Sequence, residues 1–279
     1  MKVRFFCGGP IKSGTTFLQR LLDTHPSISC FSEQYFNYLL NDLMAVHKRY
    51  NNVLNDVASL IGVPANLMQE QSFLEGFYKI IESFFEIQNG KKIIGINDND
   101  FIIHNAKPIL KNIKNSRIIY ILRNPIDTSL STWDHFYSLC IKKNDKKILD
   151  RLVVNGELNK EKFILKRSKE LGILASKVLD NANTFSDRVL VIYYEELTNN
   201  KEHTINKITN FLGVKTSSQV MEELLNNTSF EFMKKNSTNP SFYKEARNNA
   251  GHNLLSKNTI NQAMIEAGRL GKIYSDYII

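Results

Sequence analysis

The stretch from Cys7 to Leu18, CGGPIKSGTTFL, constrains the fold of this chain more than any other part of the sequence. It follows a short apolar run, Val3–Phe6, and it leads into a segment in which Leu18, Leu21 and Leu22 recur at helical spacing. This pattern predicts a strand, a tight glycine-bearing turn and a helix. Such a turn directs several backbone N–H groups and the positive end of the helix at one point, which is an arrangement that binds phosphate.

The glycines of this turn have the outer spacing of a Walker A loop, but the lysine stands elsewhere. Gly9 and Gly14 are followed by Thr15 and Thr16, whereas a Walker A lysine comes directly after the second glycine. The only lysine in the turn is Lys12, inside the loop. A P-loop kinase or NTPase therefore stays an alternative whose lysine is missing, although Thr16 is able to serve a metal ion.

Strand-like and helix-like segments alternate along the chain. Short apolar runs rich in β-branched residues predict strands buried on both faces, at Val3–Phe6, Lys92–Ile96, Arg117–Leu122 and Arg188–Tyr193. Apolar residues at helical spacing predict helices at Gly14–Asp23, Glu33–Lys48, Leu67–Ile87, Lys162–Leu179 and His203–Phe211. Strands separated by long helices predict an α/β fold with a parallel, doubly wound sheet, in a single domain over residues 1–279. Phosphate ligands then belong at the carboxyl ends of the strands.

A second motif, RNPIDTSLSTWDHF, begins at Arg123 directly after a predicted strand. Pro125 suits the first turn of a helix, and that helix carries Ser131 eight residues after Arg123. A guanidinium group and a hydroxyl in this arrangement are able to bind one phosphate together, because arginine suits two parallel hydrogen bonds to phosphate. Taken alone, the spacing favours an arginine that caps a strand end and a serine on a polar helix face. Beside the glycine-bearing turn, it favours a phosphate site.

Together the two motifs resemble those of sulfotransferases that use 3′-phosphoadenosine 5′-phosphosulfate (PAPS). The turn is similar to the PKSGTT loop of that family, and the RNP…S arrangement is similar to its 3′-phosphate site. The resemblance implies a three-layer, P-loop NTPase-like sulfotransferase fold, with a central parallel sheet flanked by helices. It also implies a PAPS-dependent enzyme that sulfates an acceptor, releases adenosine 3′,5′-bisphosphate (PAP) and needs no metal.

The resemblance assigns roles to individual residues of the two motifs. Lys12 lies beside the oxygen that leaves with the 5′-phosphate, and it stabilises the negative charge growing there. Arg123 and Ser131 hold the 3′-phosphate and thereby fix the position of the donor. The remaining loop residues implied in binding the 5′-phosphate are Ser13, Gly14, Thr15 and Thr16.

Two aromatic residues are implied in binding the adenine. Phe17 follows the threonine pair, where the family often has an aromatic residue that stacks on the base. Tyr194 belongs to a fragment, VIYYEELTNNKEHTINKITNFLGV, that resembles the family's strand, YEDL-like turn and helix ending in FLG. Both residues equally fit the apolar core, Phe17 on a helix face and Tyr194 beneath the end of the sheet.

Sulfuryl transfer to a hydroxyl also needs a group that accepts the hydroxyl proton. The fragment HPSISCFSEQYFNY resembles the stretch that carries a glutamate base in protein-tyrosine, heparan and many bacterial sulfotransferases, and Glu33 matches that place. The alternative is that Ser32 caps a helix and Glu33 stabilises its first turn. Around the second predicted strand the chain reads GINDNDFIIH, where relatives carry a lysine or a histidine. The further candidates for the base are Asp98, Asp100 and His104.

A segment near the C-terminus, FYKEARNNAGHNLLS, resembles the RKGxxGxWKN loop of the family without its glycines and its tryptophan. Lys244 and Asn253 keep two positions of that loop. The resemblance implies that Lys244 or Arg247 contacts the 3′-phosphate.

Charge and cysteine content limit the partners. The net charge of +8 suits a small polyanion or reflects a lysine-rich composition, and the sequence has no run of five like charges, which disfavours a nucleic-acid-binding arm. The three cysteines match no zinc or haem spacing and are typical of a reducing compartment. The early first strand leaves no room for a signal peptide and no apolar run reaches the length of a membrane span, so we expect a cytoplasmic protein without membrane insertion.

The acceptor and the oligomeric state stay open. We expect a hydroxyl of a small molecule, carbohydrate or lipid, with an amine as the second choice, and a non-catalytic nucleotide-binding relative as a further alternative. The polar segment Ile141–Lys162 predicts a solvated surface loop, with a mobile lid as its alternative. Aromatic residues of two predicted helices either line a pocket, form an interface or pack in the core: Tyr35, Phe36, Tyr38, Phe73, Phe77 and Phe84.

Overall fold

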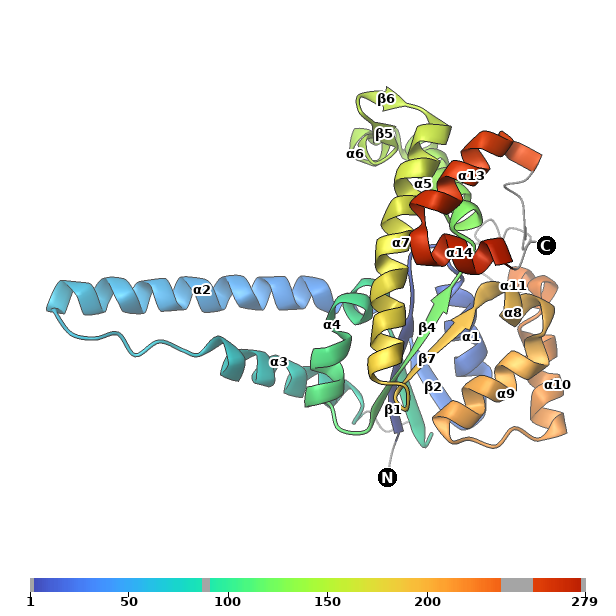
Figure 1. Cartoon of the computed structure of the whole chain (residues 1–279). Helices are drawn as coiled ribbons and strands as arrows, with labels where there is room; N and C mark the ends of the chain where they lie inside the picture. The colour runs from blue at the N-terminus through green and yellow to red at the C-terminus, as the bar shows by residue number, and fades with distance from the viewer. Residues whose placement is uncertain (1–2, 87–90, 237–252, 277–279) are drawn as a thin grey trace.

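The centre of the computed structural model is a five-stranded parallel sheet (Figure 1). The model describes residues 3–86, 91–236 and 253–276. The strand order is β2-β3-β1-β4-β7, and every neighbouring pair is parallel. The strands are β1 (Val3–Gly8), β2 (Ile28–Phe31), β3 (Ile93–Asn97), β4 (Ser116–Leu122) and β7 (Val189–Tyr193). The predicted α/β fold with a parallel sheet is confirmed.

Helices cover both faces of this sheet and complete three layers (Figure 1). One face is covered by α1 (Thr15–Thr24), α8 (Tyr194–Asn199), α9 (Lys201–Leu212) and α10 (Ser218–Asn227), which α11 (Phe230–Lys235) follows. The other face is covered by α3 (Glu70–Phe84), α4 (Asn99–Asn112), α7 (Lys160–Thr184) and α14 (Gly268–Asp276). Against α7 also pack α5 (Pro125–Lys143) and α13 (Lys257–Glu266).

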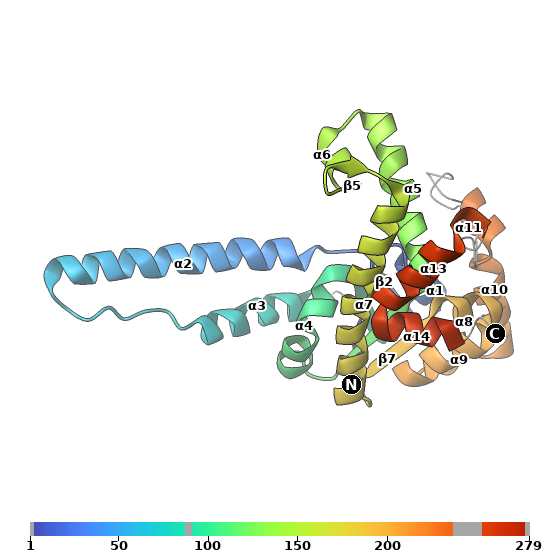
Figure 2. The ribbon, with the colours of Figure 1, turned by 45° about the horizontal axis from the view of Figure 1, so that its top comes forward.

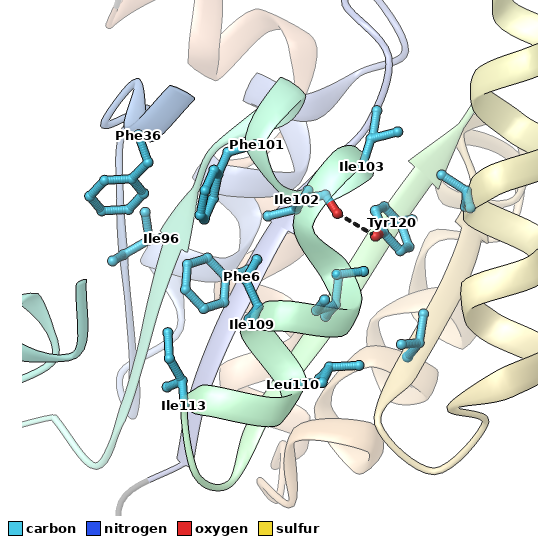
Figure 3. Packing of buried hydrophobic residues seen from close by; sticks show 14 of the residues in the cluster. Phe6, Phe36, Ile96, Phe101, Ile102, Ile103, Ile109, Leu110, Ile113 and Tyr120 are labelled. Atoms are coloured by element: carbon cyan, nitrogen blue, oxygen red, sulfur yellow. Dashed lines mark hydrogen bonds between the residues drawn. The ribbon is translucent and has the colours of Figure 1, made fainter. Parts of the chain in front are cut away.

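The alternation of side chains along each strand divides the core into two clusters. Phe6 and Tyr120 point to the side of α4, whereas Phe5 lies on the side of α1. Figure 3 shows the first cluster, in which the buried Tyr120 hydroxyl donates a hydrogen bond of 2.7 Å to the carbonyl of Ile102. Because both faces are covered, the strands read as nearly continuous apolar runs, which is why four of them are predictable from the sequence.

The region after α1 differs from the prediction. Ile28–Phe31 forms β2, an edge strand that the sequence did not predict, and α2 (Phe36–Ile61) begins later and ends later than the predicted helix Glu33–Lys48. The N-cap residue of α2 is Tyr35, so Ser32 does not cap the helix and Glu33 does not belong to its first turn. The interpretation of Glu33 as a helix-start residue is therefore wrong.

The segment Ile141–Lys162 is a folded excursion rather than the predicted solvated loop. The helix α5 continues to Lys143, and α6 (Lys146–Asp150) and a hairpin of β5 (Val153–Val154) and β6 (Glu157–Leu158) follow. Leu152 is fully buried in a cluster with Trp133 and Phe163. This small core ties the excursion to α5 and α7, although most of its polar residues face solvent as predicted.

The helices α2 and α3, with the connection between them, form an arm that projects from the sheet (Figures 1 and 2). Gly62 ends α2 in a left-handed conformation, with φ of 69°. Asn51 then exchanges two hydrogen bonds with the backbone of Met68, at 2.9 and 3.0 Å, which holds the returning chain against α2. No described helix has the length and apolar character that crossing a lipid bilayer requires.

Two glycines allow a test of the sheet packing. A Cβ atom on Gly95 would lie 1.9 Å from the ring of Phe5, whereas nothing lies within 4 Å of one on Gly76 in α3. We expect Gly95→Ala to lower the free energy of unfolding by at least about 2 kcal/mol, because the buried ring has to move. Gly76→Ala is the matched control, with a gain of up to about 1 kcal/mol from helix propensity. Urea denaturation measures both, and equal stabilities of the two variants would contradict the packing.

Candidate functional site

All five strands of the sheet are parallel, so their carboxyl ends meet at one edge. The glycine-bearing loop follows β1 there, Glu33 follows β2, and Asp98 follows β3. Arg123 follows β4, and Tyr194 follows β7. The predicted functional residues from five separate parts of the chain therefore lie at the same edge, which is where ligands bind in sheets of this kind.

The loop between β1 and α1 lies directly on the ends of β4 and β7. A Cβ atom on Gly9 would stand 2.1 Å from the carbonyl oxygen of Ile121, and one on Gly14 would stand 2.4 Å from the ring of Tyr194. Gly14 also has a φ of 98°, in the region that favours glycine. Both positions need glycine, because only a residue without a side chain lets the loop pack this closely on the strand ends.

The loop is also fixed from inside and strained at its lysine. Ser13 is buried, and its amide and hydroxyl both donate to the carbonyl of Pro10, at 3.1 and 2.6 Å. Lys12 has a φ of 71°, which is uncommon for a residue with a side chain. Among the described residues, the non-glycine residues with positive φ are Lys12, Tyr35 and three asparagines. Lys12 and Tyr35 both lie at this edge, and strain of this kind gathers at functional sites.

The first turn of α1 presents its backbone N–H groups to the same edge. Leu18 donates to the carbonyl of Gly14 at 3.0 Å, so the amides of Thr15, Thr16 and Phe17 precede the first helical hydrogen bond. Thr15 is buried and Thr16 half-buried. The amides and the positive end of the helix have the arrangement that is typical of an anion site, although binding itself stays a prediction.

Arg123 connects this loop to the aromatic residues beside it. Its guanidinium carbon lies 4.5 Å from the centroid of the Tyr194 ring, and its Nη1 donates to the carbonyl of Lys12 at 3.4 Å. The Tyr194 ring in turn packs edge-on against Phe17, with centroids 6.5 Å apart. The loop lysine, the arginine and both predicted aromatic residues thus form one connected group, in which the rings also contribute to the core.

A second cation lies at Phe17 that the sequence did not predict. The Lys201 amine is 5.3 Å from the centroid of the Phe17 ring and donates to the carbonyl of Thr228 at 2.9 Å. Burial lowers the pKa of Lys201 to about 8. Because one lysine among many in the sequence carries no local signal, only the fold identifies it.

The turn into α5 is held by the half-buried carboxylate of Glu195. The side chain of Asn124 caps the helix, accepting from Ile126 at 2.9 Å, and Ser131 is seven residues further on the same helix face. Glu195 accepts from the Asn124 amide at 3.1 Å and from the Tyr274 hydroxyl at 2.5 Å, and burial raises the pKa of Glu195. This support from α8 and α14 was also not predicted.

The candidate bases have different environments. Glu33 is half-buried and accepts a hydrogen bond of 3.2 Å from the side-chain amide of Asn99. Burial raises the pKa of Glu33, although hydrogen bonds from Asn99 oppose part of the shift. Asp98 is buried and accepts from the Phe36 amide at 2.8 Å, and burial raises its pKa to about 6. Asp98 therefore fixes the start of α2 directly behind Glu33.

The other candidates are less closely tied to this group. Asp100 is exposed, and the hydrogen-bond partner of His104 is Lys177 of α7, at 3.4 Å. Asn253 is exposed. Lys244 and Arg247, the C-terminal candidates for the 3′-phosphate, lie outside the described residues. The arrangement at the edge thus combines a helix N-terminus, three cationic side chains (Lys12, Arg123 and Lys201) and a half-buried carboxylate.

Known structures share this fold. Mouse sulfotransferase SULT7A1, solved in complex with PAP, superposes with a TM-score of 0.61 at 17% identity, over 99% of this chain and 89% of that one. Retinol dehydratase in complex with androsterone and PAP gives a TM-score of 0.53 at 13% identity, over 96% and 80% of the two chains. At these identities the similarity concerns the fold alone.

Sequence relatives give the same family. A 3-alpha-hydroxysteroid sulfotransferase from Cavia porcellus is 25% identical over 169 residues, 58% of this chain and 55% of the relative. A membrane-associated sulfotransferase, kil1 of Dictyostelium discoideum, is 29% identical over 147 residues, 50% of this chain but 24% of the relative. The matches thus span about half or less of these relatives. The model of the sulfotransferase domain family matches residues 4–266, and this chain accordingly belongs to the sulfotransferase family.

Proposed function

We propose that this protein transfers the sulfuryl group of PAPS to the hydroxyl of a small-molecule acceptor. The observation that carries the proposal is the connected group of the Lys12 loop, Arg123 and Tyr194, with Glu33 at the same edge of the sheet. The structural neighbours that were solved with PAP support a donor of this chemistry. The family to which the chain belongs supports the same reaction.

The donor site that we propose uses both phosphate-binding motifs. The 5′-phosphate meets Lys12 and the loop from Ser13 to Thr16, where the backbone N–H groups of the first turn of α1 are available to it. Arg123 and Ser131 bind the 3′-phosphate, and the rings of Phe17 and Tyr194 face the adenine. Lys201, beside Phe17, adds positive charge at this end of the site.

The donor supplies an activated sulfuryl group, and the residues of this chain supply a base and a stabilising cation. Glu33 takes the proton of the acceptor hydroxyl as the oxygen–sulfur bond forms. Lys12 stabilises the negative charge that develops on the 5′-phosphate oxygen as the bond to sulfur breaks. The sulfated acceptor, PAP and the proton on Glu33 account for every atom of the reactants. Charge at the donor is met by lysine, arginine and backbone dipoles, and the proposal includes no metal.

A small apolar acceptor suits the side of the site where α2 begins. Tyr35 and Tyr38 are 56% and 71% exposed there, with ring centroids 6.0 Å apart, and the Tyr35 side chain interacts with Glu33. Phe36 and Phe77, by contrast, are buried in the core. The steroid named for one relative and the androsterone bound to one structural neighbour support an acceptor of this class. The free cysteines Cys7, Cys30 and Cys140 suit a reducing compartment, which supports the cytoplasm.

Calorimetric titration tests the donor site. We expect metal-free binding of PAP that is tighter than binding of ADP or of ATP with Mg²⁺, and about 100-fold weaker binding in Arg123→Ala, since two charge-assisted hydrogen bonds are lost. Arg117→Ala is the control, because Arg117 also stacks on an aromatic ring, at 5.5 Å from Phe211, but lies near the N-terminal end of β4, away from the site. A preference for ATP with Mg²⁺ would replace this proposal with a P-loop kinase or NTPase.

Substitution of the loop lysine separates catalysis from binding. We expect Lys12→Met to lower kcat by about 100-fold or more, because the positive charge acts on a group that becomes more negative in the transition state. The loss of PAP affinity should be much smaller. Lys79→Met, at an exposed position on α3, should leave both quantities unchanged. Unchanged turnover in Lys12→Met, with intact PAP binding, would indicate a non-catalytic relative.

The pH profile identifies the base. Because burial raises the pKa of Glu33 and the base acts when deprotonated, kcat/KM should fall on acidification with a midpoint above the ordinary glutamate range. Glu33→Gln should remove this decline and lower the rate by about 100-fold or more. Asp100→Asn, an exposed neighbour, should preserve it. A decline that persists in Glu33→Gln and vanishes in Asp98→Asn would assign the base to Asp98 instead.

A further inference from the structure

The helix α2 carries an outer stripe of apolar residues along the arm. The spacing of its members alternates regularly between four and three residues, and most of them face solvent. Val46, Tyr50, Val53 and Val57 are 46–53% exposed, and Leu60 is 86% exposed. The full stripe is Leu39, Leu43, Val46, Tyr50, Val53, Val57 and Leu60.

The period of this stripe points to a helical partner. Seven apolar positions at a mean spacing of 3.5 residues are the a and d positions of heptads, with Leu43, Tyr50 and Val57 at a. In a straight helix of 3.6 residues per turn such a stripe drifts by about 20° per heptad, and supercoiling of two helices removes this drift. At 1.5 Å per residue the stripe is about 32 Å long, enough for three heptads.

The arm itself does not occupy the stripe. The returning chain packs on the adjoining face of α2, where His47 and Asn51 bind the carbonyl of Met68, each at 2.9 Å. The body of the protein covers only the base of the helix, where Leu40 and Leu43 contact the core. From Val46 to Leu60 the stripe is left for another helix.

A second copy of α2 fits this stripe in an antiparallel orientation. Each residue at an a position then faces a residue at a d position of the second copy. One register sets Tyr50 opposite Val53. The same register sets Val57 opposite Val46 and Leu43 opposite Leu60. This register covers the stripe from Leu43 to Leu60, including its most exposed member. A shift by one heptad places Leu39 opposite Val57 and leaves Leu60 uncovered.

The charges beside the stripe select the same register. The g positions are Asp42, Arg49 and Asp56, and all three side chains are exposed. In the first register Arg49 of each copy meets Asp56 of the other, which gives two opposite-charge pairs. In the shifted register Arg49 meets Arg49 and Asp42 meets Asp56. In a parallel pair, Asp56 of one copy lies beside Ile61 of the other, and Arg49 lies beside Leu54. Neither charged side chain then has a partner of opposite charge.

We propose that this chain forms a homodimer in which the two α2 helices pair as an antiparallel coiled coil. Tyr50 and Val53 lie at its centre, and the Arg49–Asp56 pairs flank them. The acidic residues beside the stripe disfavour an anionic lipid surface as the occupant, since helices that lie on membranes carry lysine and arginine there. Each arm, with its own α3, then contributes two helices to a four-helix assembly.

Charge exchange on the full-length chain tests the pairing. Light scattering coupled to gel filtration should give twice the chain mass of 32.1 kDa for the wild type. We expect Arg49→Asp alone and Asp56→Arg alone to raise the dissociation constant of the dimer by about tenfold, because each creates two like-charge contacts. The double variant exchanges the charges and should return to within about threefold of the wild type. Val53→Glu should abolish the dimer, and circular dichroism should show that all variants remain folded.

Three results would overturn the proposal. One is a wild-type monomer at concentrations of about 100 μM, well above the dissociation constants of stable dimers. Another is a monomer that sediments with phosphatidylserine-containing vesicles, which would assign the stripe to lipid. The third is a dimer that Arg49→Asp weakens and the double variant does not restore, because that dimer would not use this register.

Discussion

The contact between the backbone of Gly9 and the end of β4 determines the geometry of the whole candidate site. No side chain fits between Gly9 and the Ile121 carbonyl, and none fits between Gly14 and Tyr194. The loop is therefore held at both of its glycines against the two strands whose ends carry Arg123 and Tyr194. Since Arg123 also donates to the Lys12 carbonyl, the same contact sets the distance between the two motifs that are predicted to bind phosphate.

The site concentrates polar groups that burial disfavours. Burial raises the pKa values of Glu33, Asp98 and Glu195, so their charged forms are less stable there than in water. Between the ordinary aspartate range and a pH of about 6, Asp98 binds more protons in the folded state than in the unfolded state. The contribution of Asp98 to the free energy of unfolding therefore falls as the pH rises through this interval. A carboxylate kept at such a position is more readily explained by chemistry than by stability.

The parts of the fold and site that were predictable are those with a local sequence signal. The glycine spacing indicates the loop, the apolar runs indicate four strands, and the position of Arg123 after one run places it at the carboxyl edge. The contributions of Lys201 and Glu195 depend on packing between distant segments, so no local pattern indicates them. The strand β2 is short and lies at the sheet edge, and the end of α2 depends on Gly62 rather than on a change in polarity. The excursion after α5 reads as polar because its single fully buried anchor, Leu152, is outnumbered by solvated residues.

The hydrogen bond from Tyr274 to Glu195 links α14 to the turn where α5 begins. If α14 detaches, Glu195 loses its phenol partner while it still accepts from the Asn124 amide, and a half-buried carboxylate is left partly unsatisfied. Detachment of the helix and loosening of this turn are therefore energetically coupled. In amide hydrogen exchange, α14 and the start of α5 should behave as one opening unit, although more than a hundred residues of sequence separate them. The position of the turn that carries Arg123 thus depends on a helix from the far end of the described chain.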